Sequence, residues 1–111
     1  MLLEIHERFN LMELLAVQED SFANWKERRV IKEILSPNFE EVNKIGLKEV
    51  ESNMGKRLEW DTGKAADMTK DLPISQWAHQ TIRTKLSELN HKSELPERYV
   101  SIFEKFVVDY E

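Results

Sequence analysis

The chain has 111 residues, of which 33% are charged and 41% are hydrophobic, a size and balance typical of one folded domain rather than of a disordered segment. Its formal net charge of −5 argues against non-specific binding to nucleic acid. The lack of cysteine excludes a disulfide framework, a thiolate nucleophile and a thiolate metal site.

Two amphipathic helices are expected in the first third of the chain. Apolar residues recur at spacings of three and four over about residues 3–16, which predicts a helix with a buried face. Three leucines widen this stripe and indicate burial on more than one side: Leu11, Leu14 and Leu15. Ser21 is placed to cap a second helix at about 22–35. The inner positions of that helix are expected to be Phe22, Trp25, Ile31, Ile34 and Leu35.

A short third helix should follow a clear stop. Pro37 cannot continue the second helix. Asn38 is placed to cap a helix at about 39–45, and Gly46 stands where a left-handed C-cap residue is needed.

A β-hairpin is the natural interpretation of residues 47–61. Two short runs flank a turn rich in Gly and Asn, with Leu58 and Trp60 expected on one face. Because a two-stranded hairpin is marginally stable alone, we expect Trp60 to anchor it on the helices. Residues 62–70 have no apolar period and predict a loop with at most one helical turn.

Two further helices are expected in the last third of the chain. Ser75 can cap a helix at about 76–90. Ser93 can start a last helix at about 94–108, with Pro96 in its first turn, where a missing N–H costs little.

The predicted fold is therefore mainly α, with four to five short helices around one core and a small β-hairpin. An α+β fold is the alternative. We expect residues 1–111 to form a single helical domain, with the hairpin at about 47–61. Side chains at the centres of the apolar stripes should be buried, namely Phe9, Ile31, Ile82 and Phe103.

The polar residues do not form a recognisable catalytic or metal site. The histidines lack partners at zinc-ligand spacing and are interpreted as surface or cap residues: His6, His79 and His91. The serines fall at helix caps rather than on a nucleophile turn, and the chain has no phosphate-binding glycine loop. We therefore expect no enzymatic activity, no metal and no cofactor.

The only basic stretch lies on the second predicted helix. Its cations are Lys26, Arg28, Arg29 and Lys32. Glu27 and Glu33 interrupt the stretch, and a DNA recognition helix normally belongs to a more basic domain. A solvated, salt-bridged helix face, with Arg29 and Glu33 paired across one helical turn, is therefore favoured over a nucleic-acid contact.

The aromatic residues point to a partner surface. A chain of this size cannot easily bury three tryptophans and five phenylalanines completely. Tryptophan and tyrosine are enriched at protein interfaces, so we expect some of them at a partner or self-association surface. The candidates are Trp25 and Trp77, with a basic flank of Lys26, Arg29 and Lys32 that would steer an acidic partner.

Several short motifs occur in a recognisable order along the chain. They are Phe39-Glu40-Glu41-Val42, Leu58-Glu59-Trp60, a Pro-Ile-Ser helix start at 73–75 and Phe103-Glu104-Lys105-Phe106. This pattern resembles short, uncharacterised proteins of bacteriophages and prophages. The resemblance implies a small cytoplasmic accessory protein that acts by binding, and it transfers no functional residue.

The expected function is a non-enzymatic protein–protein interaction module that binds a protein partner or a second copy of itself. One alternative is a DNA-binding regulator that uses the helix at about 22–35, although nucleic acid is the less favoured partner. Another is a module that sequesters a small ligand between helices or subunits. No window approaches the roughly 18 apolar residues of a membrane span, and the N-terminus lacks a basic signal region, so a cytoplasmic protein is expected.

Overall fold

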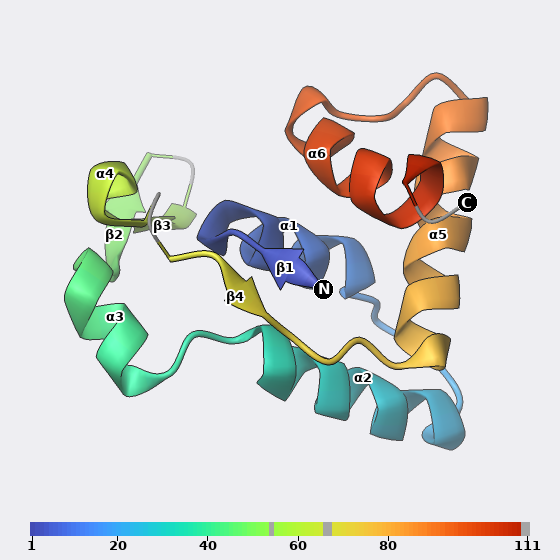
Figure 1. Cartoon of the computed structure of the whole chain (residues 1–111), viewed down its shortest axis with the longest axis horizontal. Helices are drawn as coiled ribbons and strands as arrows, with labels where there is room; N and C mark the ends of the chain where they lie inside the picture. The colour runs from blue at the N-terminus through green and yellow to red at the C-terminus, as the bar shows by residue number, and fades with distance from the viewer. Residues whose placement is uncertain (54, 66–67, 110–111) are drawn as a thin grey trace.

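The computed structural model describes residues 1–53, 55–65 and 68–109. The fold is mainly α with small β elements, as expected (Figure 1). The elements in chain order are β1 (Leu2–Leu3), α1 (Ile5–Leu15), α2 (Phe22–Leu35), α3 (Phe39–Ile45), β2 (Lys48–Ser52), β3 (Gly55–Glu59), α4 (Thr62–Ala65), β4 (Lys70–Asp71), α5 (Gln76–His91), the 3₁₀-helix η1 (Glu97–Tyr99), α6 (Val100–Phe103) and the π-helix η2 (Glu104–Val108).

The predicted caps of α2 and α3 are present. The Ser21 hydroxyl accepts a hydrogen bond from the Asn24 N–H at 3.2 Å. Asn38 accepts from the Glu41 N–H at 2.9 Å, and the Glu41 carboxylate accepts from the Asn38 N–H at 3.0 Å, which completes a capping box. Gly46 closes α3 with a φ of 65°, a left-handed conformation that favours glycine.

The N-terminal segment forms a strand that the sequence analysis did not predict. Leu2–Leu3 pairs antiparallel with Lys70–Asp71, so α1 starts at Ile5 rather than at residue 3. The Glu4 N–H donates to the Glu7 carboxylate at 3.0 Å and fixes the first turn of the helix. This pairing joins segments about 70 residues apart, a distance that local sequence patterns do not reveal.

The main core lies between α1, α2, α5 and the C-terminal helical segment. Its members with no exposed surface are Leu3, Leu11, Leu35, Ala78, Ile82, Leu86, Ile102 and Phe106. Ile31 and Ile82 are buried as predicted, but Phe103 is only half-buried because the inner positions of its helix are taken by Ile102 and Phe106. The prediction that Phe22 faces inward is wrong, since 74% of that residue is exposed at the first position of α2.

A second, smaller cluster holds α3, α4 and the hairpin β2–β3 together at one end of the molecule (Figure 1). The Trp60 ring packs on Phe9 with the centroids 5.0 Å apart, beside the buried side chains of Ile5 and Ile45. The prediction that Trp60 packs on a helix is thus confirmed. Phe9 was expected to be fully buried, but it is half-buried, because it lies at the edge of this small cluster.

Leu58 does not share the buried face with Trp60, contrary to the prediction. Leu58 is 46% exposed within β3, whereas Trp60 follows the end of the strand. The Asp61 N–H donates to the Ile45 carbonyl at 2.8 Å. This hydrogen bond draws the chain after β3 toward α3 and turns Trp60 onto the helices.

The last helical segment begins at Glu97 rather than at Glu94. Ser93 is not its cap but a turn residue with a φ of 57°. The Glu94 N–H donates to the Leu89 carbonyl at 2.8 Å, so the chain after α5 is held in a turn that reaches Pro96 before helical structure resumes. Pro96 therefore precedes the helical segment instead of lying within its first turn.

Candidate partner-binding groove

The helices α1 and α2 form an antiparallel pair with a groove along one side. Arg8 near the start of α1 donates to the Leu35 carbonyl at 2.9 Å, and Arg28 of α2 donates to the Leu15 carbonyl at 2.6 Å. The groove has a volume of about 220 Å³. We call it the α1–α2 groove and define it by Met12, Leu15, Trp25, Ile31, Lys32 and Leu35.

The sequence places two of the predicted partner residues in this groove. Trp25 and Lys32 are seven residues apart, two turns of α2, and therefore lie on the same side of the helix. Trp25 is 39% exposed. The floor between them is apolar, and it includes the buried side chains of Leu15, Ile31 and Leu35.

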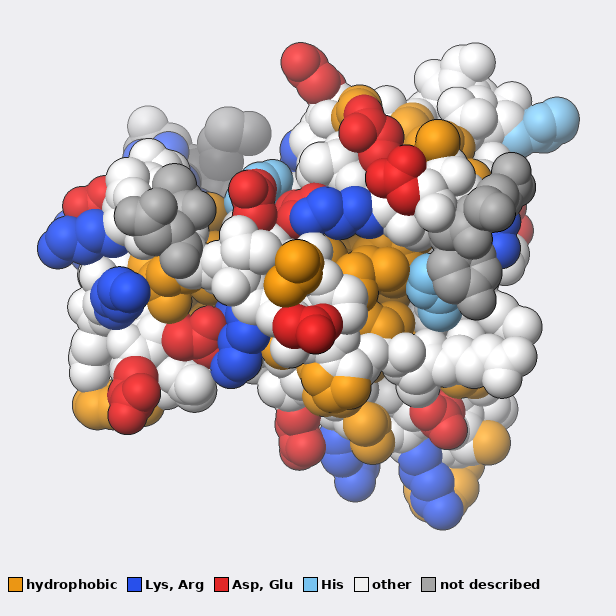
Figure 2. All heavy atoms as spheres, viewed as in Figure 1, with side chains coloured by type: hydrophobic (Ala, Val, Ile, Leu, Met, Phe, Trp, Pro, Cys, Tyr) orange, Lys and Arg blue, Asp and Glu red, His pale blue; other side chains and the backbone are white. Residues whose placement is uncertain are grey.

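The other two predicted cations lie beside the groove on the outer face of α2. Lys26 and Arg29 are both exposed, and the Lys26 ammonium lies 4.8 Å from the centroid of the exposed Phe22 ring. In the described part of the chain, none of Lys26, Arg29 and Lys32 forms an ion pair, so the predicted pairing of Arg29 with Glu33 is wrong. Figure 2 shows basic and hydrophobic side chains side by side over α2, along the lower edge of the molecule.

Arg28 lines the groove but is held in place by the fold. Its Nε donates to the Asp20 carboxylate at 2.8 Å, and its guanidinium lies 5.5 Å from the centroid of the Trp77 ring. Hydrogen bonds from Asn24, from Arg28 and from the Ser21 N–H lower the pKa of Asp20 below its ordinary value. Arg28 therefore stabilises the junction of α1, α2 and α5 and is less available to a ligand than the exposed cations.

The two candidate tryptophans have different surroundings. Trp77 is half-buried, packs against the main core, and donates from its indole N–H to the Asn24 side chain at 3.2 Å. It joins α5 to α2 and does not line the groove. Trp77 and Trp60 are half-buried and each packs against a core cluster, whereas Trp25 is the most exposed of the three tryptophans. The structure thus brings Trp25 and Lys32 together and places Trp77 elsewhere.

The α1 wall of the groove was not predicted as a site. Met12 supplies this wall above the floor residue Leu15, and Ala16 and Val17 extend it past the end of the helix. The widened apolar stripe of α1 was the available sequence signal, because a stripe broader than one face leaves apolar side chains beside the main contact.

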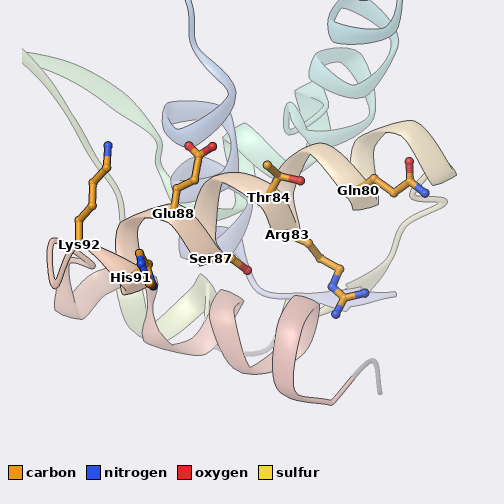
Figure 3. Close-up of a pocket in the computed structure, with 7 residues that line it drawn as sticks. All are labelled: Gln80, Arg83, Thr84, Ser87, Glu88, His91 and Lys92. Carbon is orange, nitrogen blue, oxygen red and sulfur yellow. The ribbon is translucent and has the colours of Figure 1, made fainter.

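A larger hollow along α5 has a volume of about 710 Å³ but does not enclose a site. Six of the seven residues that line it come from α5, and the seventh, Lys92, directly follows the helix. Figure 3 shows their side chains spread along the helix rather than directed at one point. A single convex helix surface cannot surround a small ligand as a cleft does.

His79 corrects the expectation that all three histidines are surface or cap residues. It is buried on α5, with its ring 5.1 Å from the ring of Phe106. Burial lowers the pKa of His79, and the nearby charge of Arg83 lowers it further. Within the described ranges, no three His, Asp or Glu side chains gather closely enough to hold a metal ion.

Comparisons with known proteins identified no relative of this chain. No protein-family model, no curated protein and no solved structure matches the chain. Among the described residues, no helix has both the length and the hydropathy that crossing a lipid bilayer requires.

Proposed function

We propose that the protein is a non-enzymatic interaction module that binds a protein partner through the α1–α2 groove and the cations beside it. The observation that carries this proposal is Trp25. It is the most exposed of the three tryptophans, at 39%, and it lines an apolar groove. Interface tryptophans flanked by apolar surface are frequent hot spots. Lys26, Arg29 and Lys32 would steer an acidic partner toward it.

The groove itself weighs against a small ligand. A volume of about 220 Å³ is below the roughly 300–1,000 Å³ of ordinary small-molecule sites. Part of its wall is the immobilised side chain of Arg28. A few apolar side chains of a partner fill such a space better than a metabolite does.

DNA binding through α2 is the less favoured alternative. Arg28 donates hydrogen bonds to Asp20 and to the Leu15 carbonyl, so one cation of the basic stretch is already engaged within the fold. Glu27 and Glu33 are exposed on the same helix, where they would repel phosphates. We propose in addition that the protein acts in the cytoplasm as a small phage- or prophage-type accessory protein.

The test is capture of a partner from an extract of the source cells by tagged wild-type protein, Trp25→Ala and Lys32→Glu. Truncating a hot-spot tryptophan costs on the order of 2 kcal/mol, about thirtyfold in affinity. Both variants should therefore lose the partner and keep a native circular dichroism spectrum. Leu58→Ala is the matched control, because Leu58 is 46% exposed on the hairpin, away from the groove. Equal capture by all four proteins would contradict the proposal.

A further inference from the structure

The shape of the α1–α2 groove favours an elongated occupant. Trp25 and Leu35 both line it and are ten residues apart on α2, which is about 15 Å along a helix axis. A helix of about ten residues has the same length. Two antiparallel helices present a trough between their ridges, and a third helix laid in it completes a common three-helix packing.

The backbone of the groove walls also favours a helix over an extended peptide. Both walls come from α-helices, apart from the short segment after Leu15. The backbone groups within these helices already bond within the helix, so an added strand would find no ladder of free donors and acceptors. A helical ligand satisfies its own backbone and needs only side-chain contacts.

The exposed charges of α2 are mixed, with an excess of cations. The exposed cations Lys32, Arg29 and Lys26 outnumber the exposed acids Glu27 and Glu33. The loop that joins α1 to α2 adds the exposed residues Gln18 and Glu19, which carry no positive charge. A complementary helix therefore carries acidic residues on the flank that faces α2 and neutral or basic residues on the other flank.

We infer that the occupant of the α1–α2 groove is an amphipathic helix of a partner chain, about ten residues long, with an apolar stripe and acidic residues along one flank. This inference rests on the proposed function and names the class of partner. A second copy of this chain fits less well. Its short helix α3 exposes Phe39 and Glu40, but the inner face of α3, with Glu41 and Ile45, is already buried in the fold.

The experiment uses three fluorescein-labelled peptides of about fifteen residues, a length at which isolated helices begin to form. The first has leucines at helical spacing and glutamates on one flank. The second replaces the glutamates with lysines, and the third is the glutamate peptide with a central proline. Fluorescence anisotropy with the full chain should show binding of the glutamate peptide. The lysine and proline peptides should bind roughly tenfold more weakly or not at all.

Variants of the full chain locate the binding. The double variant Arg29→Glu/Lys32→Glu should reverse the preference toward the lysine peptide, whereas Lys44→Glu, an exposed cation on α3, should leave it unchanged. Ala16→Phe should block the groove, because Ala16 is exposed and lines it. Trp25→Ala should weaken binding of the glutamate peptide by roughly tenfold or more.

Several outcomes would overturn the inference. Equal binding of the glutamate and lysine peptides would refute the acidic flank, and equal binding of the proline peptide would refute the helix. Binding that Trp25→Ala and Ala16→Phe both leave intact would place the peptide elsewhere. Dimerisation in sedimentation runs that Trp25→Ala abolishes, without peptide binding, would make a second copy the occupant. If no peptide binds but capture of a cellular partner still depends on Trp25, the inference fails and the proposed function stands.

Discussion

Replacing Arg8 with methionine should remove much of the stability of this fold. Only 1% of the Arg8 side chain is exposed. Its guanidinium donates to the Glu41 carboxylate at 2.6 and 3.3 Å and to the carbonyls of Leu35 and Ser36 at 2.9 and 3.0 Å. Methionine fills a similar space but leaves a mostly buried carboxylate and two carbonyls without these donors. Breaking a buried ion pair in this way costs about 3–5 kcal/mol, a large part of the roughly 5–15 kcal/mol by which small domains are stable.

The loss of stability caused by Arg8→Met should depend on pH, because it depends on the charge of Glu41. Burial alone would raise the pKa of Glu41, but the hydrogen bonds from Arg8 and the Asn38 N–H, with the charges of Arg8 and Lys70, lower it below the ordinary value. A carboxyl with a lowered folded-state pKa stabilises the fold above its unfolded-state pKa and loses that contribution as the pH falls through the folded-state pKa. The difference in the free energy of unfolding between the wild type and Arg8→Met should therefore become smaller in acid.

Urea unfolding followed by circular dichroism measures this cost. Arg98→Met is the matched control, because Arg98 pairs with Glu13 while both side chains are 54% exposed. Exposed pairs contribute about 1 kcal/mol or less. The double variant Arg8→Met/Glu41→Met should recover part of the loss, since no unpaired carboxylate then remains. A loss of less than about 1 kcal/mol for Arg8→Met, equal to that of Arg98→Met, would refute the argument.

Three further predictions follow from the two clusters. Trp60→Ala should accelerate hydrogen exchange at the amides of β2 and β3 before the helices unfold, because the Trp60 ring attaches the hairpin to Phe9; unchanged exchange there would place the anchor elsewhere. Phe106→Ala should cost about 3–5 kcal/mol in urea unfolding, and Phe103→Ala clearly less, because only Phe106 is fully buried. Burial lowers the pKa of His79, so the unfolded chain binds its proton first, and folding stability should fall as the pH drops below about 6.5. Thermal melts of wild type and His79→Gln across that range would show the difference, and parallel curves would contradict it.

The helices were predictable because residues close to each end in the sequence determine where a helix begins and ends. Ser21 and Asn38 cap α2 and α3 through a side-chain oxygen, and each bonds a backbone N–H three residues later in the chain. Gly46 closes α3 because a left-handed residue is needed there. Such signals act within one helical turn and need no knowledge of the rest of the fold.

The remaining features depend on contacts between distant segments. Leu2–Leu3 forms a strand only because Lys70–Asp71 returns beside it. Glu7, which is 1% exposed, is buried only because Lys105 of η2 reaches it at 2.6 Å. A charged residue on a helix is normally exposed to solvent, so helical spacing alone does not predict the burial of both Arg8 and Glu7. One signal was present for Arg8, because it lies three residues after Ile5 and four before Met12, on the spacing of a buried stripe.

The α2 side of the candidate site was predictable, because it depends only on local helical spacing. The face that carries Trp25 and Lys32 follows from helical spacing along α2 alone. The opposite wall depends on how α1 packs, and Trp77 was placed with Trp25 because both are tryptophans near apolar stripes. Only the three-dimensional contacts separate them, since Trp77 bonds Asn24 and packs against the core.

The groove shows which of its residues can report on binding. Leu15 and Leu35 form part of its floor, but they are also buried in the main core, so their apolar character is required by folding whether or not a partner exists. Trp25 is different, because it is 39% exposed. A change at Leu15 or Leu35 would lower stability and binding together and could not distinguish the two. Trp25→Ala should lower the free energy of unfolding less than a change at Leu15 or Leu35, because Trp25 is partly exposed whereas both leucines are buried. Its effect on binding can therefore be separated from its effect on folding.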